Sequence, residues 1–177
     1  MGRIRSQLTI AVLLSLQFSA LTLSAQSQGT VVPKTSAEAE IRAVYDRWAS
    51  AFKARDLDAI MSVYASGNNL VAYDISAPLQ YVGRDAYRKD YEEFLAGYQG
   101  PIDVEYRDLR IVAGNDVGFV HALERISGTL KNGQKLEFWL RATSGLRKIN
   151  GKWLIVHDHV SVPADFETGK ALLDLTP

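Results

Sequence analysis

Three side chains able to bind or move protons occupy alternate positions in the strand-length run Trp153–Val162. They are His157, His159 and Ser161, each two residues from the next. Side chains two apart on a β-strand point to the same face, so we expect the three groups together. A neutral imidazole both donates and accepts hydrogen bonds, so the two histidines are candidate catalytic residues for binding a carbonyl or hydroxyl group or shuttling protons. Alternatively, they are hydrogen-bonded within a polar core or at a dimer contact.

Asp74 is the candidate general base. It follows the short apolar run that begins at Leu70 and precedes a Ser-Ala-Pro turn. Burial of this carboxylate in a pocket would raise its pKa and suit it to accept a proton. The competing interpretation is structural, because an aspartate beside such a turn commonly caps the backbone of Ile75 and Ser76.

A second polar face follows the run Lys135–Ile149, where Glu137, Trp139, Arg141 and Thr143 alternate with apolar residues. This face could line a pocket, with Trp139 and Arg141 contacting a ligand. It could equally carry an ion pair between Glu137 and Arg141 in solvent, which is the commoner fate of such residues.

His121 lies between Phe119 and Leu123 on one predicted strand face, which favours a core histidine over a ligand contact. A metal pair of His157 and His159, completed by His121 or a carboxylate, is a further alternative. Two histidines alone are weak evidence for a metal, so we predict neither a metal site nor a cofactor. The sequence also lacks a phosphate-binding glycine loop, a Gly-x-Ser-x-Gly elbow and a His-Glu-x-x-His motif.

Aromatic residues on the predicted helices would form the apolar wall of any pocket, because pockets are mostly apolar with a few polar anchors. We expect these rings to be core residues first and ligand contacts wherever a cavity reaches them. The candidates are Tyr45, Trp48, Tyr64 and Tyr91.

Three helices are predicted before residue 101. Thr35 and Glu38 form a capping box ahead of an apolar stripe that recurs at helical spacing as far as Phe52. Asp56 can cap a second helix, which Gly67 and Asn68 end. A third begins near Gly83 and closes around Gly97 to Pro101.

Strands dominate the rest of the chain. Two short strands, Leu70–Asp74 and Leu79–Val82, separate the second and third helices. Four long runs follow, with breaks that include Asn132–Gly133 and Asn150–Gly151, and Asn-Gly is a strong hairpin signal. They are Ile102–Ala113, Val117–Leu130, Lys135–Ile149 and Trp153–Val162. Helices first and a strand meander last predict an α+β domain with the helices on one face of an antiparallel sheet.

The first residues have the layout of a secretory signal peptide, with Arg3 and Arg5 ahead of an apolar stretch and small residues near Ser27. We predict a signal peptide at residues 1–27, a linker at 28–35 and one domain at 36–177, hence a secreted or periplasmic protein without stable membrane insertion after cleavage. An uncleaved membrane anchor is the alternative.

Composition narrows the function classes. Twenty basic and 20 acidic residues cancel, and no basic run is present, so nucleic acid is not an expected partner. The absence of cysteine excludes disulfides and thiolate chemistry. An apolar fraction of 47% is that of an ordinary globular domain.

The order of elements, together with four stretches of sequence, resembles the nuclear transport factor 2-like superfamily, and within it the SnoaL-like and ketosteroid-isomerase-like proteins. The resemblance covers about Glu38 to Val162. The matching stretches are 45–52 (YDRWASAF), 56–64 (DLDAIMSVY), 81–87 (YVGRDAY) and 151–161 (GKWLIVHDHVS).

The resemblance implies a cone of strongly bent sheet, a cystatin-like roll, whose wide end is closed by helices over a pocket. It also implies frequent homodimers through the outer sheet face. Asp74 matches the position of the general-base aspartate of ketosteroid isomerase, whereas Trp48 stands where the oxyanion tyrosine would be. The second acid falls near residues 141 to 143, none of which is acidic.

Three functions remain open, because this fold hosts many. The first is an exported protein that binds an apolar ligand with a polar anchor in an internal pocket. The second is an isomerase, cyclase or dehydratase with Asp74 as base and with His157, His159 and Arg141 on the substrate oxygen. The third is a non-catalytic dimeric interaction module.

Overall fold

The computed structural model describes residues 36–177, so the predicted signal peptide, the linker and Thr35 of the predicted capping box lie outside the described residues. The first helix, α1 (Ser36–Ala54), buries the stripe predicted from the sequence. Its ring and aliphatic side chains face the sheet, where they begin the core. They are Ile41, Val44, Tyr45, Trp48, Ala51 and Phe52.

Helix α2 (Leu57–Met61) is shorter than its apolar spacing predicted. The Asp56 side chain accepts a hydrogen bond from the Ala59 backbone N–H at 3.0 Å, as expected of a cap. The chain leaves the helix early because Val63 and Ala65 exchange backbone hydrogen bonds with Ile155, each at 2.9 Å. This pairing with a distant strand draws Tyr64 into the core, where it is fully buried.

Helix α3 (Arg84–Ala96) follows a short 3-10 turn, η1 (Gly67–Asn69), and two short strands. It begins after Gly83, whose φ of 91° favours glycine, and whose missing Cβ would lie 2.9 Å from the Asn68 side-chain oxygen. Tyr87, Tyr91 and Leu95 form its buried face. The helix therefore contributes mainly aromatic rings to the interior.

The sheet has six strands in the order β2-β1-β6-β5-β4-β3. Neighbouring strands are antiparallel except β1 and β6, which run parallel. The strands are β1 (Val71–Tyr73), β2 (Tyr81–Val82), β3 (Tyr98–Ala113), β4 (Val117–Leu130), β5 (Lys135–Ile149) and β6 (Lys152–Ser161).

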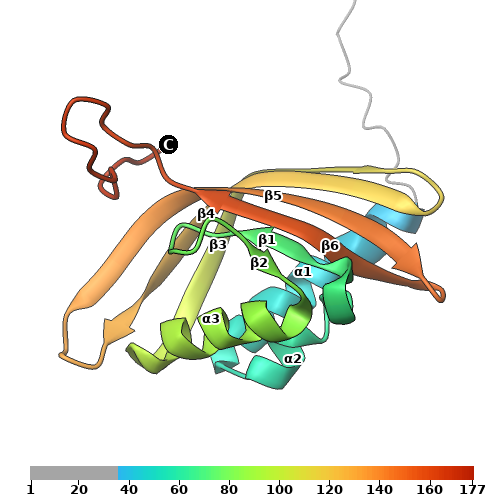
Figure 1. The fold of residues 1–177 in the computed structure, drawn as a ribbon, viewed down its shortest axis with the longest axis horizontal. Coiled ribbons are helices and arrows are strands. Elements are labelled where there is room, and N and C mark those ends of the chain that lie inside the picture. The colour runs from blue at the N-terminus through green and yellow to red at the C-terminus, as the bar shows by residue number, and fades with distance from the viewer. Residues whose placement is uncertain (1–35) are drawn as a thin grey trace, which may run out of the picture. The chain divides into compact units, whose positions relative to one another are not determined.

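The three α-helices lie on one face of the curved sheet (Figure 1). We call this the inner face, and the opposite one the outer face. Gly118 shows how closely α1 approaches the inner face, since a Cβ there would lie 2.5 Å from Ile41 Cδ1. The predicted α+β class, with helices over one side of a bent, unclosed sheet, is confirmed.

Candidate functional site

A cavity of about 350 Å³ lies between α1, α3 and the inner face of the sheet. This size is at the lower end of the range usual for small-molecule pockets. Nine aromatic residues contribute to its wall, and the stacked rings of Trp48 and Phe52 have centroids 4.8 Å apart. The nine are Tyr45, Trp48, Phe52, Tyr64, Tyr87, Tyr91, Phe94, Tyr106 and Phe138.

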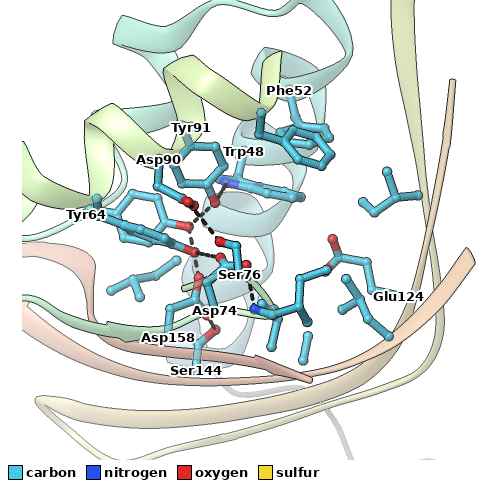
Figure 2. Close-up of a pocket in the computed structure, with 18 of the residues that line it drawn as sticks. Trp48, Phe52, Tyr64, Asp74, Ser76, Asp90, Tyr91, Glu124, Ser144 and Asp158 are labelled. Atoms are coloured by element: carbon cyan, nitrogen blue, oxygen red, sulfur yellow. Dashed lines mark hydrogen bonds between the residues drawn. The ribbon is translucent and has the colours of Figure 1, made fainter. Parts of the chain in front are cut away.

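Asp158 is the acceptor on which a network of buried donors converges. The Tyr64 hydroxyl donates to Oδ2 at 2.9 Å, and the Ser144 hydroxyl donates to Oδ1 at 2.7 Å. Because Tyr64 gives its only proton to Asp158, it accepts from the Tyr91 hydroxyl, 2.6 Å away. Figure 2 shows Tyr64 and Ser144 meeting the carboxylate.

Two further donors extend this network to α1. The Tyr45 hydroxyl donates to Ser144 at 2.7 Å, and the Trp48 indole N–H donates to the Tyr91 hydroxyl at 3.2 Å. Burial nevertheless raises the pKa of Asp158 to about 6, while the Ser144 and Tyr64 hydrogen bonds act in the opposite direction. Asp158 is therefore ionised at neutral pH but can take up a proton just below it.

A β-bulge explains why Asp158, and not its neighbours, faces the cavity. Ile155 pairs with Leu146 and His157 with Gly145, so Val156 is an extra residue on β6. Trp153 and Ile155 point inward before the bulge, and Asp158 does so after it.

The predicted catalytic histidines consequently lie on the outer face, and the expectation that they would face the pocket is wrong. His157 Nδ1 is 2.9 Å from the backbone oxygen of Val71. His159 is exposed, and both imidazoles pack edge-on against Tyr73. They do share one face, as strand alternation requires, but it is the face away from the cavity.

Glu124 on β4 is the second buried acid of the cavity, with only 6% of its surface exposed. In the part of the chain that the structure describes, its carboxyl group has no hydrogen-bond partner. Burial, reinforced by the charges of Asp158 and Asp74, raises its pKa to about 8. Glu124 therefore carries a proton at neutral pH, and in Figure 2 it stands apart from the Asp158 network.

Asp74 lies where the cavity reaches solvent, beside the exposed residues Ile75 and Ser76. Its Oδ1 accepts from the Ile75 backbone N–H at 2.7 Å, and its Oδ2 accepts from the Tyr87 hydroxyl at 3.0 Å. Both sequence interpretations thus describe its contacts, since it caps the turn and also lines the cavity. Burial and the nearby Asp90 raise its pKa.

The predicted ligand-contact residues divide between the two faces. Tyr45, Trp48, Tyr64 and Tyr91, all from the helical half of the chain, line the cavity.

The predicted contacts on the strands lie outside the cavity. Trp139 packs between Arg107 and Arg125, whose guanidinium carbons are 5.6 and 6.0 Å from its ring centroid. Arg141 pairs with Ser161 across β5 and β6. His121 is exposed beside Phe119, so its expected place in the core is wrong; odd-numbered residues of β4 face outward and Val120, Ala122 and Glu124 face inward.

Asp158 and Glu124 were missed as site residues, although the sequence carries a signal for both. Glu124 is the one charged residue in the alternating series Val120, Ala122, Glu124 and Ile126. Asp158 likewise stands between Val156 and Val160 on the apolar half of its run. A lone acid on an apolar strand face indicates a buried carboxyl group, which is rare unless it is functional or paired.

No group of three or more histidine, aspartate or glutamate side chains among residues 36–177 could hold a metal ion. No helix in the same range is long and apolar enough to cross a membrane.

Comparison with solved structures identifies relatives of the same fold. An NTF2-like protein of unknown function from Pseudomonas putida is 36% identical, with a TM-score of 0.73 over 81% of this chain and 99% of that one. A ketosteroid isomerase-like protein from Erwinia carotovora is 21% identical, with a TM-score of 0.61 over 72% and 97%. A cystatin-like fold protein from Nostoc punctiforme is 14% identical, with a TM-score of 0.58 over 70% and 88%.

Comparison with curated proteins gave no match. The model of the SnoaL-like domain matches residues 41–165, which include most of α1, all of α3 and all the long strands. The fold, this match and the Pseudomonas putida relative agree with the resemblance seen in the sequence. The chain therefore belongs to the SnoaL-like domain family of NTF2-like proteins.

Proposed function

We propose that the protein binds a small, largely apolar molecule in the inner cavity and holds its polar group on the carboxyl groups of Asp158 and Glu124. One observation carries this proposal: Glu124 is buried in an aromatic-walled cavity without a hydrogen-bond partner among the described residues. A buried carboxyl group left without a partner costs free energy. A ligand that supplies the partner recovers that cost, and the rings supply apolar contact area.

A cavity-filling variant tests this proposal. Ala142 is buried on the cavity side of β5, and its neighbour Thr143 faces outward. We expect Ala142→Phe to abolish thermal shifts given by small aromatic molecules, whereas Thr143→Phe adds the same ring outside and keeps them. Circular dichroism checks that both variants fold. Equal shifts in the wild type and Ala142→Phe would contradict the proposal.

A proton-transfer activity is the second candidate, favoured by two carboxyl groups that face one cavity with pKa values raised to about 6 and about 8. At neutral pH Asp158 is then a base, and protonated Glu124 can donate a hydrogen bond to a carbonyl oxygen. Asp74 is an alternative base at the mouth of the cavity. This would be chemistry of the isomerase or dehydratase type.

Deuterium exchange at the α-carbon of β-tetralone, followed by NMR in heavy water, tests for that base without knowledge of the natural substrate. We expect catalysed exchange to disappear in Asp158→Asn if Asp158 is the base, and in Asp74→Asn if Asp74 is. Exchange no faster than that of buffer alone would count against the enzymatic candidate and leave the binding proposal standing.

Two further expectations concern export and assembly. Export rests on the predicted signal peptide, and processing at its end can be read by mass spectrometry of the protein from culture.

A homodimer through the outer face is supported by the cross-strand pair Val112 and Phe119, which are 65% and 47% exposed. We expect Phe119→Lys to shift sedimentation from dimer to monomer, and an unchanged dimer would move the contact elsewhere.

A further inference from the structure

The residues that line the cavity are charged with one sign only. Five are acids, and none of the lining residues is lysine, arginine or histidine. Two acids, Asp158 and Glu124, lie deep in the cavity, and three, Asp74, Asp90 and Glu93, lie near the mouth. A cleft lined by one sign of charge in low-dielectric surroundings attracts ligands of the opposite sign.

Three carboxyl groups of the cavity differ in their hydrogen-bond partners. Asp158 accepts from two hydroxyl groups, and Asp74 accepts from a hydroxyl and a backbone N–H. Glu124 accepts from no described residue, and 94% of its surface is buried. Burial favours its protonated, neutral form, and a donor on a ligand, above all a positively charged one, would stabilise its ionised form.

The aromatic wall indicates which kind of cation fits. Aromatic faces attract an organic ammonium group through their quadrupoles, while the rings cover its apolar body. A bare metal ion needs several oxygen or nitrogen ligands on the protein, and residues 36–177 offer no such cluster. An anionic ligand would meet only like charges.

We propose that the ligand of this cavity is an organic cation, a protonated amine on a small aromatic or alicyclic body, whose ammonium group lies between Glu124 and Asp158. This inference rests on the proposed binding function and names its ligand class. Glu124 supplies the second negative charge by releasing its proton when the amine binds. Asp158 supplies the first negative charge, because two hydroxyl donors stabilise its ionised form.

Proton release gives the inference a pH dependence with a definite sign. Asp158 on β6 and Asp74 after β1 raise the pKa of Glu124, whose charge in turn raises the pKa values of Tyr45 on α1 and Tyr106 on β3. Its neighbour on β5 is the apolar Leu140. The tyrosines stay neutral because burial raises their pKa values further. Amine affinity must therefore rise with pH up to about 8, where free Glu124 loses its proton.

Three probes with related skeletons and different charges test the proposal: phenethylamine, phenethyl alcohol and hydrocinnamate. We expect calorimetry to give measurable binding for the amine, weaker binding for the alcohol and none for the acid. Amine affinity should increase several-fold, up to about tenfold, from about pH 6.5 to about pH 7.5. The amine remains protonated over this range, as a lysine side chain does.

Glu124→Gln should weaken the amine about tenfold or more at pH 8 and leave the alcohol within about twofold. The variant keeps the shape of the side chain and breaks no hydrogen bond to another described residue, so we expect it to fold. The pH series in the wild type is a second measurement that does not depend on the variant.

The outcomes separate this inference from the function on which it rests. If the alcohol or hydrocinnamate binds as tightly as the amine and Ala142→Phe abolishes that binding, the cavity binds ligands but the cation inference is wrong. Amine binding that is unchanged in Glu124→Gln, or that falls from pH 6.5 to pH 7.5, also overturns the inference. If no probe binds, or if Ala142→Phe leaves binding intact, the proposed function fails with it.

Discussion

Two adjacent residues on β4, Arg125 and Glu124, show that charged side chains have different surroundings on the two faces of the sheet. Arg125 faces outward, where Glu105 and Glu137 accept from it and solvent reaches 32% of its side chain. Glu124 faces inward, where aromatic rings and two other acids surround it. The outer face thus has many polar groups that solvent or ion pairs satisfy. The inner face has few, and some of them, among them the Glu124 carboxyl group and the Tyr106 hydroxyl, have no hydrogen-bond partner among the described residues.

The density of polar residues therefore does not locate the site. Histidines, arginines and a tryptophan gather on the outer face, where exposed ion pairs contribute little free energy. The inner face has two deep acids, and burial changes the pKa of each. Desolvation, rather than residue type, distinguishes the candidate site from the opposite surface.

The largest expected difference between the faces is in the pH dependence of stability. Folded Glu124 holds its proton up to about pH 8, whereas the unfolded chain releases it near its ordinary pKa of 4.5. Unfolding releases a proton between these values, so rising pH favours the unfolded chain. Relative to Glu124→Gln, the wild type should lose roughly 4 kcal/mol of unfolding free energy across this window.

Urea denaturation at several pH values measures this effect, with Glu137→Gln as the outer-face control. The control should follow the wild type within about 0.5 kcal/mol at every pH. Parallel curves for the wild type and Glu124→Gln would mean that Glu124 is not desolvated in solution.

A smaller effect should separate two buried tyrosines. Tyr64→Phe removes a donor from ionised Asp158 and should cost about 1.5 to 3 kcal/mol at neutral pH, and less below about pH 6, where Asp158 is protonated. The hydroxyl of Tyr98 is buried with no hydrogen-bond partner among the described residues. Tyr98→Phe should therefore be neutral or stabilising, and equal losses in the two variants would contradict the network.

Two glycines extend the comparison to packing. Alanine at Gly118, on the inner face, would place its Cβ 2.5 Å from Ile41 Cδ1 and should cost about 1 to 2 kcal/mol. Alanine at Gly145 would meet only the His157 Cβ, at an ordinary 3.6 Å, and should be neutral or slightly stabilising. Thermal denaturation of both variants checks the difference, and a stable Gly118→Ala would show that α1 can move away from the sheet.

The smallest effect is expected at His159. Because its side chain is exposed on the outer face, His159→Ala should change the unfolding free energy by less than about 0.5 kcal/mol. Binding of phenethylamine should also be unaffected. If this variant lost binding, the ligand site would lie on the outer face near His159, as strand alternation predicted.

The fold was largely predictable because its signals are local. The apolar stripe of α1 and the Asn-Gly turns depend on residues close together in the chain, and Asn150 and Gly151 both adopt the positive φ angles that such a turn needs. The early end of α2 was not predictable, since it follows from pairing with Ile155, more than 90 residues away.

The site was predictable only in its aromatic half. Tyr45, Trp48 and Tyr91 face the cavity because helical spacing places them there, and Tyr64 does so although it lies beyond the end of α2. On β6 the bulge at Val156 changes which residues face inward, and no residue in that run predicts a bulge. Uninterrupted alternation therefore pointed to His157 and His159 instead of Asp158.

The titration of Glu124 in the free protein decides whether a desolvated, unpartnered acid lies in the inner cavity. Carbon-detected NMR of the side-chain carboxyl groups, with the Glu124 signal assigned by its absence in Glu124→Gln, follows this titration in the free protein. We predict a midpoint at about pH 8. A midpoint near the ordinary value of 4.5 would mean that water solvates this carboxyl group and that burial does not distinguish the inner cavity.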